Sequence, residues 1–222
     1  DLDTNGQNII ENSERLLFDL AEKGSFNSSL VKFDDAMKQT IEMASAAYKN
    51  EGGIVGVPTG LRDLDDKLGG LHQSDLIIIA GRPSMGKTAL ATNIAFNIAK
   101  KYSKGTLQDG SEGAIDGGVV GFYSLEMSAE QLAARILSEV SEVPSDQIRR
   151  GDMTEKEFRR FVEAAKSLEA CPLFIDDTPE LPITQLAARA RRLKRTNGLD
   201  VLIVDYLQLV RPASSKDSRV NE

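Results

Sequence analysis

The stretch that decides the fold is DLIIIAGRPSMGKTALATNIAFNIAKKY, residues 75–102. Its apolar opening predicts a buried strand over residues 76–80, and the spacing of apolar residues after Thr88 predicts a helix. Between them, GRPSMGKT (residues 81–88) fits the pattern G-x-x-x-x-G-K-[ST]. A phosphate-binding loop requires this order of strand, loop and helix. The stretch therefore predicts a nucleotide site in an α/β fold.

The residues of this loop suit a bound triphosphate. Gly81 and Gly86 let the backbone turn so that N–H groups and the helix dipole face phosphate oxygens. Lys87 is expected to reach the β and γ phosphates, and the Thr88 hydroxyl to bind Mg²⁺. The expected cofactors are ATP and Mg²⁺, and a plain glycine turn with an exposed lysine is the alternative. The predicted nucleotide-binding residues are Gly81, Arg82, Pro83, Ser84, Met85, Gly86, Lys87, Thr88 and Ala89.

The rest of the chain alternates between strand and helix patterns. Short apolar runs predict further buried strands over residues 119–125, 172–175 and 201–206. The intervening helices have capping-box start signals, Ser128 with Gln131 and Thr154 with Glu157. This alternation predicts a mostly parallel sheet with helices on both faces.

Carboxylates follow these strands at the edge where ligands of parallel sheets bind. Asp205 ends the run VLIVD and is the candidate ligand of Mg²⁺ or of its water shell. Glu126 follows the strand at 119–125 and is the candidate base for the water that attacks the γ phosphate. Asp176 and Asp177 compete for that role. However, adjacent residues of a strand point to opposite sides and DDTP is typical of a turn, so Glu126 is preferred.

Several segments lie outside this core. Residues 1–50 have a helical pattern with one apolar stripe, which packs either on its own domain or on a neighbouring subunit. A boundary is predicted over residues 51–59, followed by a short helix that ends at Gly69 and Gly70. The glycine-rich insertion at residues 104–118 is expected to be a long, mobile loop. The stripe consists of Leu30, Phe33, Met37, Ile41, Ala44 and Tyr48.

Composition excludes several classes of function. The formal net charge of −7, if evenly spread over the surface, would repel a nucleic-acid backbone, so such a partner requires a local basic patch. The basic cluster at residues 189–195 is interpreted as a solvated helix face rather than a phosphate contact. A single cysteine, Cys171, allows no internal disulfide, and a single histidine, His72, disfavours histidine metal sites and triads. Because no run approaches about 20 apolar residues, we expect a cytoplasmic protein.

The motifs in their order resemble a known family. VPTGLRDLDDKLGGL, DLIIIAGRPSMGKTALATNIA, FYSLEMSAEQLAARIL and VDYLQL are similar to the ATPase domain of bacterial replicative DNA helicases of the DnaB type. The resemblance covers roughly residues 54–210 and implies a RecA-like motor driven by ATP. It matches Lys87 and Thr88 to the phosphate loop, Glu126 to the catalytic glutamate and Asp205 to the Walker B aspartate.

The resemblance also carries expectations about assembly. It implies a homo-hexamer that moves on single-stranded DNA at a fork, with primase and a helicase loader as partners. Residues 1–53 correspond to a helical linker, and residues 54–222 to the amino-terminal part of the ATPase domain. The family's arginine finger and DNA-binding loops match none of the quoted motifs. We therefore expect a motor fragment, truncated at both ends, that is marginally stable and hydrolyses ATP poorly.

Two other interpretations stay open on the sequence. Another RecA-like ATPase, such as a recombinase or a regulatory clock ATPase, would share the loop and the glutamate. A non-hydrolysing nucleotide-binding loader or adaptor would share only the loop.

Overall fold

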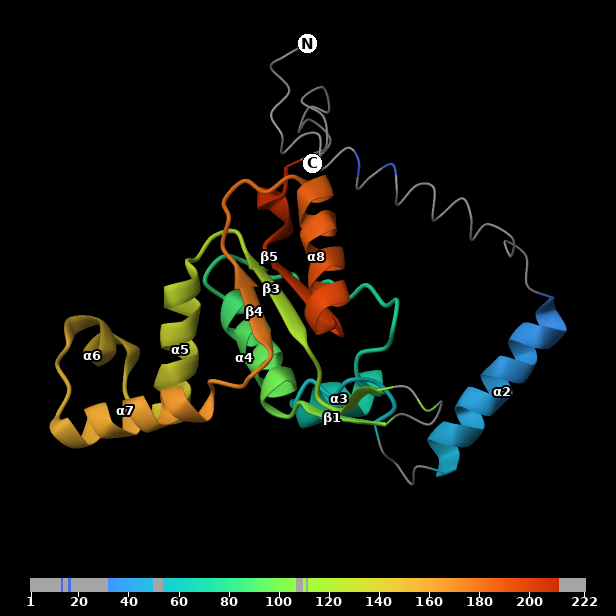
Figure 1. Cartoon of the computed structure of the whole chain (residues 1–222), viewed down its shortest axis with the longest axis horizontal. Helices are drawn as coiled ribbons and strands as arrows, with labels where there is room; N and C mark the ends of the chain where they lie inside the picture. Colours follow the sequence, from blue (N-terminus) through green and yellow to red (C-terminus); the bar gives the residue numbers. More distant parts are fainter. Residues whose placement is uncertain are drawn as a thin grey trace, which may run out of the picture.

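The centre of the molecule is a parallel sheet. The computed structural model describes residues 32–49, 54–106, 110 and 112–211, together with Ser13 and Leu16. The sheet consists of β3 (Val120–Ser124), β4 (Leu173–Asp176) and β5 (Val201–Asp205), in the order β4-β3-β5, as Figure 1 shows. These strands confirm the predictions over residues 119–125, 172–175 and 201–206 and the parallel α/β fold.

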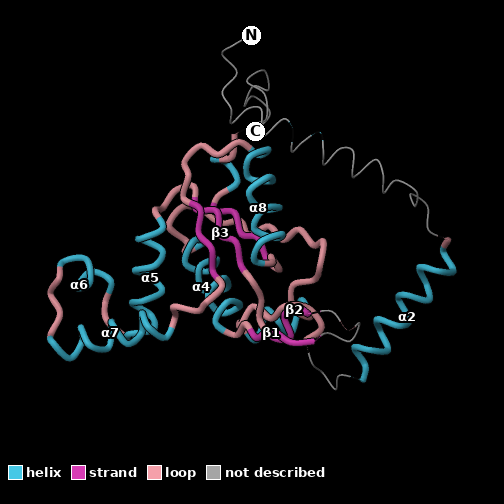
Figure 2. The backbone as a smooth tube through the Cα atoms, in the orientation of Figure 1, coloured by secondary structure: helices cyan, strands magenta, loops and turns pink. Residues whose placement is uncertain are grey.

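Helices cover both faces of the sheet, as expected. Val120 and Phe122 pack against α4 (Lys87–Lys100), whereas Tyr123 and Leu125 pack against α8 (Ile183–Asn197). This alternation follows from the two-residue period of a strand. The other helical elements are α2 (Phe33–Lys49), α3 (Arg62–Leu68), α5 (Ala129–Ser141), α6 (Ser145–Arg150), α7 (Glu155–Ser167) and the short 3-10 helix η2 (Leu207–Leu209). Figure 2 distinguishes these elements from the loops.

The predicted helix ends are confirmed. Ser128 and Gln131 form both hydrogen bonds of a capping box at the start of α5, and Thr154 and Glu157 do the same at α7. Gly69 ends α3 with a left-handed φ of 70°, which glycine adopts without strain. Local side-chain chemistry thus fixes where these helices begin and end.

The segment before α3 is tied to the phosphate-loop helix. The Asp65 carboxylate, only 5% exposed, accepts hydrogen bonds from the backbone N–H and hydroxyl of Thr59, each at 2.7 Å, and from the Gly60 N–H at 3.1 Å. The Asn97 side chain on α4 donates to the Thr59 carbonyl at 3.2 Å. These bonds fasten residues 59–65 to the end of α4.

The insertion at residues 104–118 forms strands where the structure describes it, so the prediction of a loop was wrong for those residues. Strands β1 (Ser103–Thr106) and β2 (Glu112–Asp116) form an antiparallel pair, with Lys104 and Glu112 as an ion pair. Sequence inspection missed them because glycine-rich strands lack a hydrophobic alternation. Gly117 makes the return to β3 possible, since a Cβ there would lie 2.3 Å from the Ile98 carbonyl oxygen.

The expectation of a buried strand over residues 76–80 was also wrong. This segment forms no ladder with a described strand, and Leu76 is 86% exposed. A continuous apolar run shows that a segment suits burial on both faces, but it does not specify which element covers it. Here β3 occupies the centre of the described sheet, between β4 and β5.

Helix α2 stands apart from the sheet in Figure 1. Its apolar stripe is exposed at Phe33, Met37, Ile41, Ala44 and Tyr48, while Leu30 lies outside the described residues. The described residues therefore do not show the stripe packed on its own domain. Among these residues, no helix is both long and apolar enough to cross a membrane.

Candidate functional site

The phosphate loop and the following helix have the predicted backbone, although no strand precedes them among the described residues. The loop runs from Gly81 to Gly86, and α4 begins at Lys87. Ser84 and Gly86 have left-handed φ angles of 64° and 85°. A Cβ built at Gly86 meets nothing within 4 Å, so its left-handed conformation, not lack of space, favours glycine there. Residues 81–86 and Ala89 are exposed and accessible to a ligand.

Lys87 is folded back over the loop. Its Nζ donates hydrogen bonds to the carbonyl oxygens of Gly81 at 2.9 Å and Arg82 at 3.2 Å. Lys87 and Thr88 are half-buried, and the Thr88 carbonyl accepts a bond from the Thr92 hydroxyl at 2.7 Å. The ammonium group therefore lies within the loop, where phosphate oxygens can replace its carbonyl partners.

The direction of α4 brings this loop toward the candidate acids. The Gly118 N–H donates to the Ile98 carbonyl at 3.2 Å, so the last turn of α4 lies beside the start of β3. Because α4 packs along β3 and β5, its first turn, with Lys87, lies toward the carboxyl ends of those strands. Glu126 and Asp205 follow or end these strands. The loop and both acids thus share the edge of the sheet formed by the carboxyl ends of its strands.

Asp205 presents a buried acceptor at this edge. It is 6% exposed, pairs in register with Ser124 and is followed by a cis peptide bond to Tyr206. Its carbonyl accepts a bond from the Leu125 N–H, but its Oδ2 has no hydrogen-bond partner among the described residues. A buried carboxylate oxygen without a donor is unfavourable unless a cation or an ordered water satisfies it. Its chemistry therefore fits a Mg²⁺ ion or the water shell of that ion.

Glu126 lies in the turn between β3 and α5 and is exposed. Among the described residues, none forms a hydrogen bond or ion pair with its carboxylate. The turn itself is well held. The buried Ser124 hydroxyl donates to the Met127 carbonyl at 2.6 Å, and Ser128 caps α5. A fixed backbone thus presents a carboxylate that remains available to bind water.

The competing acids at the end of β4 already have partners. Arg189 on α8 donates to both Asp176 oxygens, at 3.0 and 2.8 Å, and to the Thr178 hydroxyl at 2.7 Å. Asp177 accepts the Ala129 N–H of α5 at 2.9 Å. The two acids thus reach helices on opposite faces of the sheet, and the Thr178 N–H bond to Asp176 confirms a turn in DDTP.

The ion pair changes the acidity of Asp176. Burial alone would raise its pKa, but hydrogen bonds from Arg189 and Thr178 and the Arg189 charge together outweigh burial and lower the pKa. Arg189 is therefore part of a half-buried structural pair, and for this residue the interpretation of the basic cluster as a solvated face was wrong. Sequence inspection missed the pair because its members lie on separate elements, 13 residues apart.

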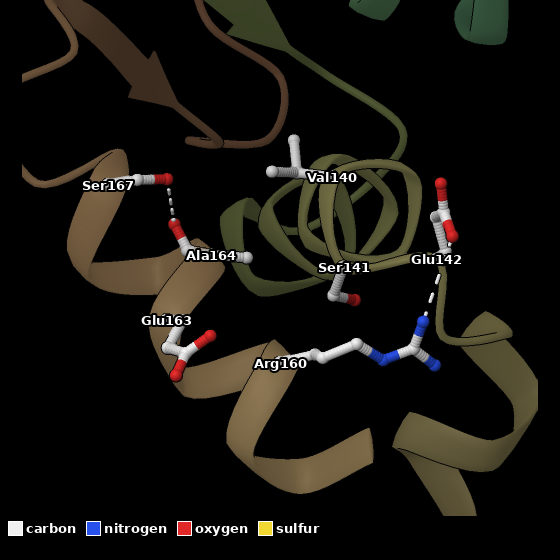
Figure 3. Close-up of a pocket in the computed structure, with 7 residues that line it drawn as sticks. All are labelled: Val140, Ser141, Glu142, Arg160, Glu163, Ala164 and Ser167. Atoms are coloured by element: carbon white, nitrogen blue, oxygen red, sulfur yellow. Dashed lines mark hydrogen bonds and ion pairs between the residues drawn. The ribbon is translucent and has the colours of Figure 1, made fainter. Parts of the chain in front are cut away.

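A pocket of about 330 Å³ lies away from this edge, between α5 and α7 (Figure 3). Arg160 on α7 lies 3.7 Å from the Glu142 carboxylate at the end of α5. Glu163 lies near Arg160 on α7. Two acids beside one arginine do not favour a phosphate group. None of the predicted site residues lines this pocket.

The donor set at the sheet edge is small. In the described part of the chain, no group of three or more His, Cys, Asp or Glu residues is arranged to hold a metal ion. Thr88 and Asp205 alone leave most coordination positions of Mg²⁺ to waters and phosphate oxygens. This is how proteins commonly bind Mg²⁺ with nucleotides.

Comparisons with known proteins identify the family of this chain. The chain is 43% identical over 221 residues to the replicative DNA helicase DnaB of Rickettsia conorii, covering 100% of this chain and 44% of that protein. It is 34% identical to the replicative DNA helicase DnaC of Bacillus subtilis, covering 97% of this chain and 44% of that protein. The chain thus spans less than half the length of these relatives.

Solved structures give the same result. A structure described as an ATPase domain superimposes with a TM-score of 0.72 at 29% identity, covering 87% of this chain and 63% of that chain. A DnaB-like replicative helicase, described with its interactions with primase, superimposes with a TM-score of 0.69 at 28% identity. The match covers 96% of this chain and 49% of that chain. Residues 56–222 match the family described as DnaB-like helicase C terminal domain. The chain therefore belongs to the family of DnaB-like helicases.

Proposed function

We propose that this chain is the motor segment of a replicative DNA helicase. The helicase hydrolyses ATP and uses the free energy of hydrolysis to move along single-stranded DNA and separate the duplex. The observation that carries the proposal is the shared sheet edge. It combines an open phosphate loop, a buried Asp205 oxygen without a donor among the described residues and an exposed Glu126 on a fixed turn. A module that only binds nucleotide requires the loop but not both acids.

The chemistry follows from these groups. Lys87 exchanges its bonds to the Gly81 and Arg82 carbonyls for bonds to the β and γ phosphates. The Thr88 hydroxyl and Asp205 would hold Mg²⁺, which supplies positive charge against the phosphates when bound. Glu126 orients a water molecule and accepts its proton as the water oxygen attacks the γ phosphorus. The bond between that phosphorus and the β–γ bridging oxygen breaks, so ADP leaves and inorganic phosphate forms. Backbone N–H groups of residues 81–89, except Pro83, which has none, bind the remaining phosphate oxygens.

The relatives and the exposed stripe support a proposal about assembly. Residues 1–53 act as a helical linker and residues 54–222 as part of the ATPase domain of a cytoplasmic homo-hexamer. The exposed apolar face of α2 docks on the neighbouring subunit, because a stripe of this kind requires a covering surface. Single-stranded and forked DNA, primase and a helicase loader are the proposed partners.

The test is unwinding of a forked duplex by the natural full-length protein that contains this chain. We expect ATP-dependent unwinding that Lys87→Ala abolishes and that Glu126→Gln lowers by about 10²–10⁴-fold in rate with nucleotide binding retained. Hydrolysis without unwinding would instead indicate another RecA-like ATPase. Nucleotide binding without hydrolysis would indicate a loader or adaptor.

A further inference from the structure

The turn that carries Glu126 is attached to more than its own strand. Its start is joined to β5 by the Leu125 N–H bond to the Asp205 carbonyl, at 2.8 Å. Its middle is closed by the Ser124 hydroxyl, which donates to the Met127 carbonyl at 2.6 Å. Its far end, where α5 begins, is joined to the segment after β4 by the Ala129 N–H bond to Asp177 Oδ2, at 2.9 Å.

The last of these bonds differs from an ordinary helix cap. The capping box of α5 is already complete, since the Ser128 side chain accepts the Gln131 N–H and the Gln131 side chain accepts the Ser128 N–H. Asp177 adds an acceptor from the segment after β4, 48 residues away, for an N–H group in the first turn. Its charge also lies at the positive end of the helix dipole.

Asp177 itself sits on a rigid support. Its neighbour Asp176 is held on the opposite face by two bonds from Arg189, and the Thr178 N–H bonds back to Asp176. The backbone on both sides of Asp177 is therefore fixed. Any displacement of the Glu126 turn away from the sheet must break the bond between Ala129 and Asp177.

We infer that Asp177 is a positioning residue for Glu126: it holds the start of α5, and through it the turn that aims the glutamate at the attacking water. The inference rests on the proposed hydrolysis of ATP. Because small misplacements of a catalytic group can reduce a rate severely, we expect Asp177→Ala to lower kcat for ATP hydrolysis by about tenfold. The KM for ATP should stay within about twofold, because the phosphate loop lies on another element.

The experiment is a double-mutant cycle in the natural full-length protein, with ATP hydrolysis measured for wild type, Asp177→Ala, Glu126→Gln and the double variant. If Asp177 acts through Glu126, Asp177→Ala has no further effect once Glu126 is replaced. Asp177→Asn, which keeps an acceptor oxygen, should restore kcat to within about twofold of wild type. An equal loss in both backgrounds, or no loss in kcat, would overturn the inference.

A matched control separates positioning from stability. Thr154→Ala removes a complete capping box from α7 and should lower the melting temperature with kcat unchanged. Asp177→Ala should cost a similar amount of stability but also lose kcat. If Glu126→Gln leaves hydrolysis intact, the proposed role of the glutamate fails, and the inference fails with it. If Glu126→Gln is slow and Asp177→Ala is not, only the inference fails.

Discussion

The backbone N–H of Leu125 and the carbonyl oxygen of Asp205 are joined by a hydrogen bond of 2.8 Å. This bond connects the ends of β3 and β5 one residue before Glu126 and at Asp205 itself. Two acids from distant parts of the sequence are thereby kept in a fixed relation by backbone atoms. Substitution of either side chain leaves that connection intact, so each acid can be tested separately.

Asp205→Asn should stabilise the protein without nucleotide while weakening its use of Mg²⁺. The substitution removes a buried charge with an unsatisfied oxygen, so we expect the free energy of unfolding to rise by about 1 kcal/mol. Nucleotide binding that depends on Mg²⁺ should weaken by at least about tenfold. Urea denaturation and nucleotide titrations at several Mg²⁺ concentrations measure the two effects. If the dependence of nucleotide binding on Mg²⁺ is unchanged, Asp205 does not bind Mg²⁺ or its water shell.

Two glycines with similar φ angles should respond differently to alanine. Gly86→Ala places a side chain in open space at φ 85°, so only the left-handed conformation is penalised, by about 1–2 kcal/mol. Gly60→Ala has a φ of 79° and also puts its Cβ 2.7 Å from Asn97, which should add at least about 1 kcal/mol. Equal losses in urea denaturation would show that Asn97 moves aside without cost.

The Asp65 network should matter more for stability than any exposed acid of α3. Asp65→Ala leaves the N–H groups of Thr59 and Gly60 and the Thr59 hydroxyl without their acceptor, so we expect a loss of about 3 kcal/mol. Asp63→Ala on the same helix, where the acid is exposed, serves as the control and should change stability by less than about 0.5 kcal/mol. Similar melting temperatures for both variants would contradict this account.

The pair between Asp176 and Arg189 should make stability depend on acid pH. The pKa of Asp176 is lowered in the folded state, so its contribution is fully present above the unfolded pKa and is lost as pH falls through the folded pKa, below about pH 4. Asp176→Asn should lose about 1–2 kcal/mol at pH 7 and show a smaller further decrease on acidification. Denaturation at a series of pH values measures this.

The exposed pair between Asp146 and Arg150 provides the control for that experiment. Asp146→Asn should change stability by less than about 0.5 kcal/mol at pH 7. If both variants follow the wild-type pH profile, the partly buried pair contributes no more than a surface pair.

The stripe of α2 should matter for assembly and not for the fold of one chain. Ile41→Glu changes a side chain that is 60% exposed, so the melting temperature of the monomer should stay within about 2 °C of wild type. In the natural full-length protein, sedimentation should show loss of the proposed hexamer. Lys38→Glu changes a charge on the same helix and serves as the control. A hexamer that survives Ile41→Glu would refute docking through this face.

The sequence predicted features that depend on local chemistry. The loop at Gly81–Thr88, the two capping boxes and the glycine end of α3 all have the expected form, because each is set by a few neighbouring residues. Three of the four predicted strands are present because their apolar runs are bounded by turns. The preference for Glu126 over Asp177 also rested on local rules, and its catalytic role stays a prediction.

Features that depend on distant partners could not be predicted in this way. The apolar run at residues 76–80 does not reveal which element would cover it. The hairpin of β1 and β2 pairs glycine-rich strands that have no alternation of apolar and polar residues. The bonds from Arg189 to Asp176 and from Ala129 to Asp177 join separate elements. The spacing of residues in the sequence does not show which distant side chains and backbone groups form hydrogen bonds in the fold.

The order of the sheet has a consequence for synthesis. The central strand, β3, is made before both of its neighbours, and the bond between the Val119 N–H and Asp200 spans 81 residues. At ordinary translation rates those residues take about 4–16 s to add. Both edges of β3 are unpaired until β4 is added, and one edge stays unpaired until β5 is added. The growing chain therefore passes through an interval in which its most buried strand lacks the neighbours that pair with it in the folded protein.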